Sequence, residues 1–197
     1  MICPSAFSGL LVAALSVTLG GVSVIQSDQL KEESDKLFTI LNMSHLTPDV
    51  LDSGLKQFSP ESKDEVVSRV AHTPQPTGFL LARLPFILTD ENKPVMEKTF
   101  IANLHSSLPE ARKFSLYGLE KLGHPELPRF AEGLLHDHDD NVLYAACFIL
   151  LPRAKKDAVL WKKMQAVYAD HKNEPSLQMS MNLLRANSIT QSHPASK

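Results

Sequence analysis

The sequence predicts an all-α fold, an α-solenoid of antiparallel helix pairs preceded by an N-terminal hydrophobic helix. Three observations lead to this prediction. Beyond residue 27 apolar side chains recur at helical spacing, prolines and glycines stand where helices would start and stop, and the pattern repeats with a period of just over 30 residues. With 197 residues, 43% of them hydrophobic and 21% charged, the chain is long and apolar enough to bury a core.

Residues 1–27 form a separate segment, because they contain no Asp, Glu, Lys or Arg. From Phe7 to Ile25 the side chains are apolar or small, and as a helix this stretch would reach roughly 28 Å, about one bilayer core. Small residues near its end suit a cleavable secretory signal, although no Lys or Arg precedes the apolar run. We expect a signal peptide or an N-terminal membrane anchor, with a buried helix of a soluble protein as the third alternative. Either of the first two places the protein outside the cytosol, secreted, periplasmic or tethered to a membrane.

Residues 28–73 are expected to form an N-terminal helical segment. Thr47-Pro48 and Ser59-Pro60 each place an N-cap residue before a proline, which is favoured at the first position of a helix. Two helices should therefore start at these prolines, after a first helix in the same segment. The apolar positions predicted to be buried are Leu30, Leu37, Phe38 and Leu41, then Leu51, Leu55 and Phe58, then Val66, Val67 and Val70.

Prolines 74 and 76 predict an elbow over residues 73–77, since each removes a backbone donor and forces its predecessor into extended geometry. A repeat array over 77–187 should follow. Its clearest helix is 109–122, ended by Gly123 as a left-handed cap, and the next two are 125–135 and about 141–151. The apolar positions of the first two are Ala111, Phe114, Ser115, Gly118, Leu119 and Leu122, then Leu127, Phe130, Ala131, Leu134 and Leu135.

The helices repeat as pairs. A shift of 31 residues superposes the apolar positions of 141–151 on those of 109–122, and a shift of 33 superposes a fourth helix over 160–168 on 125–135. Such a period is typical of an α-solenoid. Weaker units are expected upstream, with Thr77 to Leu88 as a first helix and Phe100 to Leu104 in a second, and downstream around Leu177, Met181 and Leu184. Residues 188–197 should be a disordered tail.

The stretch LPEARKFSLYGLEKLGHPELPRFAEGLLHDHDDNVLYAACFILL resembles the short HEAT-like repeats of the phycobilisome-lyase type. Leu122-Gly123 matches the end of the first helix of such a unit, and Leu134 to Asp139 matches its acidic corner. Leu143 stands where these repeats have an Arg, whose equivalent here is Arg112 of the preceding unit. The resemblance is clearest over 94–170 and implies a right-handed solenoid that serves mostly as a protein-binding scaffold.

The corner His136-Asp137-His138-Asp139-Asp140 is dense in groups that could bind a metal or transfer protons. A metal ion needs three or four converging donors, whereas neighbours in a short loop supply two at best. His124 should lie at the opposite end of the intervening helix. The simpler interpretation is a solvated corner in which Asp139 or Asp140 caps the next helix. A metal-dependent enzyme centred on residues 136–140 remains the alternative.

A basic cluster surrounds Trp161 and could form an anion-binding module, which is a second alternative. Periodicity instead places Trp161 beside the buried face and leaves the cations in solvent. The cluster consists of Arg153, Lys155, Lys156, Lys162 and Lys163. Cys147 stands in an apolar helix, so we expect a buried and unreactive thiol and no catalytic cysteine.

The leading hypothesis is a protein-binding scaffold, exported or membrane-tethered, with another protein as its partner. A formal net charge of -2 gives no basic footprint for nucleic acid. Phosphate-binding loops, nucleophile elbows and zinc-helix motifs are missing from the sequence, so we expect no cofactor, metal site or catalytic residue. The helices 109–122, 142–151 and 176–186 are candidates for the layer that binds the partner.

Overall fold

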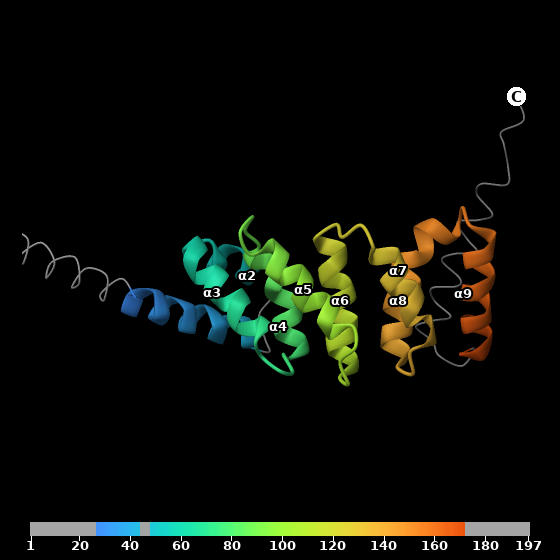
Figure 1. Ribbon diagram of the computed structural model, residues 1–197, viewed down its shortest axis with the longest axis horizontal. Helices are drawn as coiled ribbons and strands as arrows, with labels where there is room; N and C mark the ends of the chain where they lie inside the picture. The colour runs from blue at the N-terminus through green and yellow to red at the C-terminus, as the bar shows by residue number, and fades with distance from the viewer. Residues whose placement is uncertain (1–26, 44–47, 172–197) are drawn as a thin grey trace, which may run out of the picture.

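A computed structural model describes residues 27–43 and 48–171 (Figure 1). These residues form an all-α fold, with helices joined by turns and no strand among them, so the predicted fold class is confirmed in its helical content. Three predictions lie outside the described residues: the leader over 1–27, of which only Ser27 is described, the helix 176–186 and the tail over 188–197.

The N-terminal part contains the helices expected from its prolines. After a first helix over residues 27–42, α2 covers Pro48–Leu55 and α3 covers Pro60–Ala71. The hydroxyl of Ser59 caps α3 by accepting a hydrogen bond from the backbone N–H of Ser62 at 3.3 Å. All of the core residues predicted for α2 and α3 are buried, namely Leu51, Leu55, Phe58, Val66, Val67 and Val70.

Two polar contacts fasten the first helix to the rest of the molecule. The carboxylate of Glu33 accepts hydrogen bonds from the backbone N–H and the hydroxyl of Ser59, at 2.6 and 2.9 Å. At the other end, the buried guanidinium of Arg83 donates to the carbonyls of Leu41 and Met43, which supplies partners for carbonyls at a helix C-terminus.

The elbow at 73–77 is followed by a shorter helix than expected. Thr77 caps α4, Gly78–Arg83, and the chain then tightens into the 3₁₀ turn η1, Leu84–Ile87, instead of continuing as one helix to Leu88. Pro85 is the reason, because it lacks the N–H that an α-helix needs and its ring crowds the preceding turn. The rest of this unit is α5, Lys93–Asn103, which buries Phe100.

Helix α6, Pro109–Lys121, ends as predicted. Gly123 has φ +66, and the backbone N–H of His124 donates to the carbonyl of Leu119 at 3.0 Å while that of Gly123 donates to Glu120 at 3.0 Å. This pair of bonds closes the helix in the manner typical of a left-handed glycine cap. Of the predicted stripe, Phe114 is only half-buried, and α6 also buries Leu116, because it packs against α4, α5 and α8.

The following helices differ from the prediction at their ends. α7 covers Leu127–Gly133 and passes into the 3₁₀ turn η2, Leu134–His136, so residues 125–126 are a turn instead of its first residues. α8, Asp140–Ala154, continues through Pro152 beyond the expected end at 151. Phe148 and Pro152 lie on the exposed side of α8, where solvent can reach the carbonyl that loses its donor. α9 covers Ala158–Asp170.

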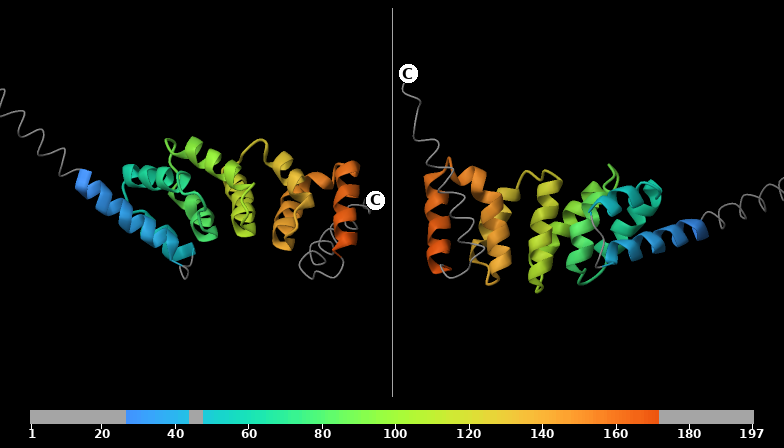
Figure 2. Two further views of the ribbon diagram at one scale, coloured as in Figure 1. Left: turned by 60° about the horizontal axis from the view of Figure 1, so that its bottom comes forward. Right: turned by 180° about the vertical axis from the view of Figure 1, so that it is seen from behind.

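From α4 to α9 the helices follow one another roughly in chain order along the long axis of the molecule, whereas α3 lies before α2 along this axis (Figure 1). In the left view of Figure 2, α3, α5 and α7 lie along the upper side and α4, α6 and α8 along the lower side. Helix α6 packs against both α4 and α8, so these three form one layer. A single apolar core runs from Leu37 to Tyr168 and continues across the elbow.

Candidate functional site

The acidic corner between η2 and α8 is tied to the preceding helix pair through Asp137. Arg112 of α6 donates from Nε and Nη2 to the two carboxylate oxygens of Asp137, at 2.7 and 2.6 Å, and from Nη1 to the carbonyl of Ser106 at 2.8 Å. Only 15% of the Arg112 side chain and 6% of the Asp137 side chain are exposed. Burial alone would raise the pKa of Asp137, but hydrogen bonds from Arg112 and from the N–H of Asp139 outweigh it and lower that pKa.

The other residues of the corner have different partners. Asp139 accepts hydrogen bonds from the N–H groups of Asn141 and Val142, at 3.0 and 3.2 Å, so the predicted helix cap is confirmed for this residue. Asp140 instead lies 2.9 Å from Nδ1 of His171, which follows α9. His136 and His138 are exposed.

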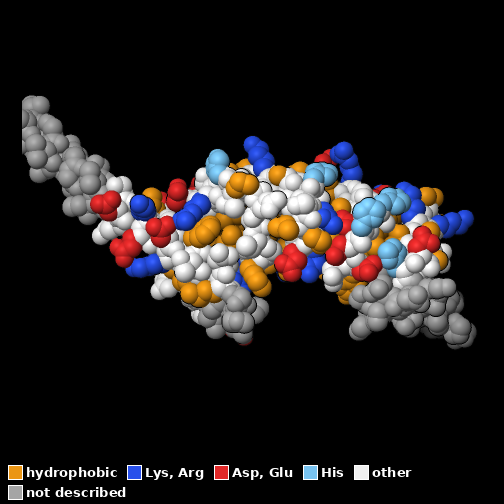
Figure 3. Space-filling view, turned by 90° about the horizontal axis from the view of Figure 1, so that it is seen from below, with side chains coloured by type: hydrophobic (Ala, Val, Ile, Leu, Met, Phe, Trp, Pro, Cys, Tyr) orange, Lys and Arg blue, Asp and Glu red, His pale blue; other side chains and the backbone are white. Residues whose placement is uncertain are grey.

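A hollow of about 550 Å³ separates this corner from α9, and His136, His138 and His171 line it together with Asp137 and Asp170. Figure 3 looks at the molecule from below and shows histidine side chains gathered toward the α8–α9 end. Within residues 27–43 and 48–171, no group of three or more His, Cys, Asp and Glu side chains is arranged to hold a metal ion.

His124 lies away from this corner, as expected. It precedes α7, whereas residues 136–140 begin at the last residue of η2, so α7 and η2 lie between the two. The ring of His124 packs 5.6 Å from the ring of Phe130, and its Nδ1 accepts a hydrogen bond from the N–H of Glu126 at 3.2 Å. It is not a third donor for the corner.

The basic cluster around Trp161 is partly neutralised. Arg153 and Lys163 both approach Glu132, at 3.4 and 3.6 Å. The indole of Trp161 packs against the core, as the periodicity predicts. The remaining members of the cluster, Lys155, Lys156 and Lys162, are exposed.

Cys147 is buried, with 1% of its surface exposed, as predicted. Burial raises the pKa of its thiol to about 11, so the thiolate is scarce at neutral pH. This environment is the opposite of the one that activates a cysteine nucleophile.

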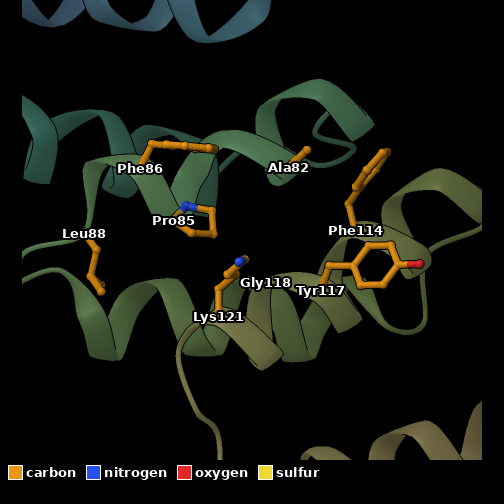
Figure 4. Close-up of a pocket in the computed structure, with 8 residues that line it drawn as sticks. All are labelled: Ala82, Pro85, Phe86, Leu88, Phe114, Tyr117, Gly118 and Lys121. Atoms are coloured by element: carbon orange, nitrogen blue, oxygen red, sulfur yellow. The ribbon is translucent and has the colours of Figure 1, made fainter. Parts of the chain in front are cut away.

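A second hollow, of about 460 Å³, is almost wholly apolar (Figure 4). It is a groove between the α4–η1 segment and α6, and Lys121 is the one charged residue among those that line it. Figure 4 shows Ala82 and Phe86 on one side of this groove and Phe114, Tyr117 and Lys121 of α6 on the other. The complete lining, which we call the apolar groove, is Ala82, Pro85, Phe86, Leu88, Phe114, Tyr117, Gly118 and Lys121.

Two glycines allow the close packing around the apolar groove. A Cβ at Gly118 would lie 2.3 Å from Cζ of Phe100, so the Phe100 ring of α5 packs directly on the backbone of α6. A Cβ at Gly78 would lie 3.0 Å from the ring of Phe114. At Gly118 a Cβ would overlap the Phe100 ring, whereas at Gly78 it would require small shifts of Glu110 and Phe114.

Aromatic side chains continue from the apolar groove across the α4–α6–α8 layer. Among the described residues the exposed phenylalanines are Phe79, Phe86 and Phe148, and each lies on α4, η1 or α8. The ring of Phe148 stacks on that of Tyr144 with centroids 6.3 Å apart. Burial and, secondarily, the proximity of Tyr144 of α8 raise the pKa of Tyr117.

The apolar groove was not identified from the sequence, where Phe114 was assigned to a buried stripe. The sequence feature that indicates this groove is the stretch 79–88, in which almost every residue is apolar. Leu80, Leu81, Leu84 and Ile87 account for the buried face and leave Phe79 and Phe86 on a second apolar face. A helix with two apolar faces indicates that the second one meets something other than the core.

No protein-family model, curated protein or solved structure matches the chain. In the part of the chain that the structure describes, no helix is both long and apolar enough to cross a membrane.

Proposed function

We propose that the chain is a protein-binding scaffold, a right-handed α-solenoid of HEAT-like helix pairs that binds another protein through its α4–α6–α8 layer. The supporting pairs are α4 with α5, α6 with α7, and α8 with α9. Their buried positions agree in register: Ala111 and Leu119 of α6 are buried, and so are Val142 and Leu150 of α8, 31 residues later.

The contact between Arg112 and Asp137 also supports this architecture. It joins the first helix of one pair to the corner that ends the next helix of the array, across 25 residues of sequence. Because Arg112 also donates to the carbonyl of Ser106, it joins the loop before α6 to the loop after α7, the two loops that link this pair to its neighbours. Repeated stacking of helix pairs produces the extended surfaces on which repeat proteins bind their partners.

The proposed binding function rests on the apolar groove. Phe79, Phe86, Leu88 and Phe148 leave between 43% and 48% of their surfaces exposed. Phe86 and Leu88 line the groove itself, and large apolar side chains exposed in a hollow are typical of protein interaction sites, where aromatic anchors supply most of the binding energy. The lining offers little for recognition of a polar metabolite.

We also propose that residues 1–27 direct the protein out of the cytosol, either as a cleaved signal or as a retained anchor. Mass spectrometry of the N-terminus of the protein purified from its own cells distinguishes the two. A mature start between Val22 and Asp28 identifies a cleaved signal, whereas an intact Met1 in the membrane fraction identifies an anchor.

Affinity capture with a blocked groove tests the binding function. Ala82 lines the apolar groove, and Ala82→Trp fills part of it. Ala102 is an exposed alanine of α5 outside the lining, so Ala102→Trp is the matched control. We expect quantitative mass spectrometry to find a partner whose recovery falls about tenfold with Ala82→Trp and is unchanged with Ala102→Trp. Equal recovery with both variants would remove the groove from the function.

A further inference from the structure

We infer that the apolar groove binds an amphipathic α-helix of the partner protein, and that this helix carries acidic residues beside its apolar face. The inference rests on the proposed binding function and adds the chemistry of the partner. It follows from the shape of the groove, from the state of its backbone groups and from the charges at its rim.

The shape matches the side-chain spacing of a helix. Phe114, Tyr117 and Lys121 lie at i, i+3 and i+7 along α6, so one wall extends roughly 10 Å along the helix axis. Phe86 stands on the opposite wall, and Ala82 leaves room between them. A volume of about 460 Å³ holds a few large side chains, which a helix projects at i, i+3 or i+4, and i+7.

The backbone of the groove favours a helix over an extended strand. The walls are α6 and the α4–η1 segment, and the backbone N–H and C=O groups inside the helices α4 and α6 are largely engaged within those helices. An extended peptide in this groove would find few main-chain partners and would leave its own polar groups unpaired against apolar walls. A helix satisfies its backbone internally, so it can bury side chains without that cost.

The charges at the rim favour carboxylates on the partner. Lys121 lines the groove, and the ammonium group of Lys113 lies 4.7 Å from the centroid of the Phe114 ring. Neither lysine forms an ion pair with another described residue. Glu110 and Glu120 belong to the same helix but do not line the groove. A partner carboxylate near Lys121 would therefore meet an unpaired cation beside an apolar surface.

A library of displayed helical peptides, selected on the full-length protein, tests this inference. We expect enriched peptides to have large apolar residues at i, i+3 or i+4, and i+7, with Asp or Glu within one turn of them. Their affinity should fall about tenfold with Ala82→Trp and remain unchanged with Ala102→Trp. Lys121→Glu should weaken the binding of acidic peptides about three- to fivefold. Replacing the peptide's acidic residue nearest to position 121 with Lys should restore the affinity.

The outcomes separate this inference from the proposed function. Selected peptides that need an open groove but are proline-rich, basic or non-helical by circular dichroism would overturn the inference and leave the binding function standing. An unchanged affinity of acidic helical peptides after Lys121→Glu would overturn the acidic part. If neither the selected peptides nor any captured partner distinguishes Ala82→Trp from Ala102→Trp, both the inference and the proposed function are wrong.

Discussion

Replacing Asp137 with alanine should be among the most damaging single changes to a charged residue of this protein. The substitution leaves the guanidinium of Arg112 without the carboxylate that binds it through two hydrogen bonds, at 2.6 and 2.7 Å. The carbonyl of Ser106 remains as the one protein partner described for that cation. The N–H of Asp139 also loses its acceptor in Asp137.

The loss of stability caused by Asp137→Ala is estimated from the small exposed fraction of the Arg112 and Asp137 side chains. With side-chain exposures of 15% and 6%, solvent replaces the lost partner only in part. Breaking a buried ion pair by removing one member costs about 3–5 kcal/mol, and the lower end applies because Arg112 keeps some contact with water. A loss of about 3 kcal/mol corresponds to a Tm lower by roughly 6–12 °C for a chain of this size.

The matched control is Asp35→Ala. Asp35 pairs with Arg69 at 2.7 Å, a distance almost equal to that in the buried pair, but the exposures of these side chains are 54% and 47%. An exposed pair contributes at most about 1 kcal/mol, so this variant should be nearly as stable as the natural protein. The two variants therefore separate the effect of burial from that of the contact itself.

The pH dependence gives a second check on the same residue. Because the folded protein lowers the pKa of Asp137, ionisation of this carboxyl stabilises the fold fully above its ordinary value of 3.8. The contribution is lost as the pH falls through the lower pKa of the folded state. The stability difference between the natural protein and Asp137→Ala should therefore be constant from pH 7 to about 5 and narrow below about pH 4.

Urea denaturation followed by circular dichroism measures these differences. We expect Asp137→Ala to lower the free energy of unfolding by about 3 kcal/mol and Asp35→Ala by less than about 1 kcal/mol. Removing both charges with Arg112→Met and Asp137→Ala should cost less than Asp137→Ala alone, since no unpaired cation is left. A cost below about 0.5 kcal/mol for Asp137→Ala would refute the role given to this pair.

Three further predictions concern packing, capping and reactivity. Gly118→Ala should destabilise the fold by about 1–2 kcal/mol in urea melts, because the new Cβ would lie 2.3 Å from the Phe100 ring and the cost of this overlap exceeds the gain in helix propensity. Adding Phe100→Leu to this variant should recover part of the lost stability. Asp139→Ala should cost about 1 kcal/mol and speed amide hydrogen exchange at Val142, which loses its cap; unchanged exchange would contradict this. Alkylation of Cys147 by iodoacetamide at pH 8, measured by peptide mapping, should be negligible in the folded protein and rapid in urea. Rapid alkylation of the folded protein would instead show that the thiol is accessible.

Local periodicity predicts the helix type and most buried positions, although Leu30 and Phe38, predicted to be buried, are only half-buried. Val66, Val67 and Val70 are buried as their spacing requires, and Gly123 adopts the left-handed conformation expected of a cap. The helix ends were less predictable around prolines. Pro85 converts a helix into a 3₁₀ turn, whereas Pro152 lies within α8, and the difference depends on tertiary surroundings that a single sequence does not contain.

The contacts between distant residues could not be predicted. Arg112 and Asp137 are 25 residues apart, and nothing in either local pattern identifies the other as its partner. The density of histidines and aspartates at 136–140 suggests a site, yet Asp137 and Asp139 are engaged in structural hydrogen bonds. The apolar groove appears only when η1 and α6 are placed side by side, since its lining comes from two separate segments.

Site-specific photo-crosslinking tests the central claim most directly. A photoreactive phenylalanine analogue at Phe86 lies in the apolar groove, and the same analogue at Val159 occupies an exposed position on α9, outside that groove. In the native cells, we expect a discrete crosslinked partner from position 86, lost with Ala82→Trp, and no such product from position 159. Crosslinks of equal yield from both positions, or a product from position 86 that persists with Ala82→Trp, would contradict binding in the apolar groove.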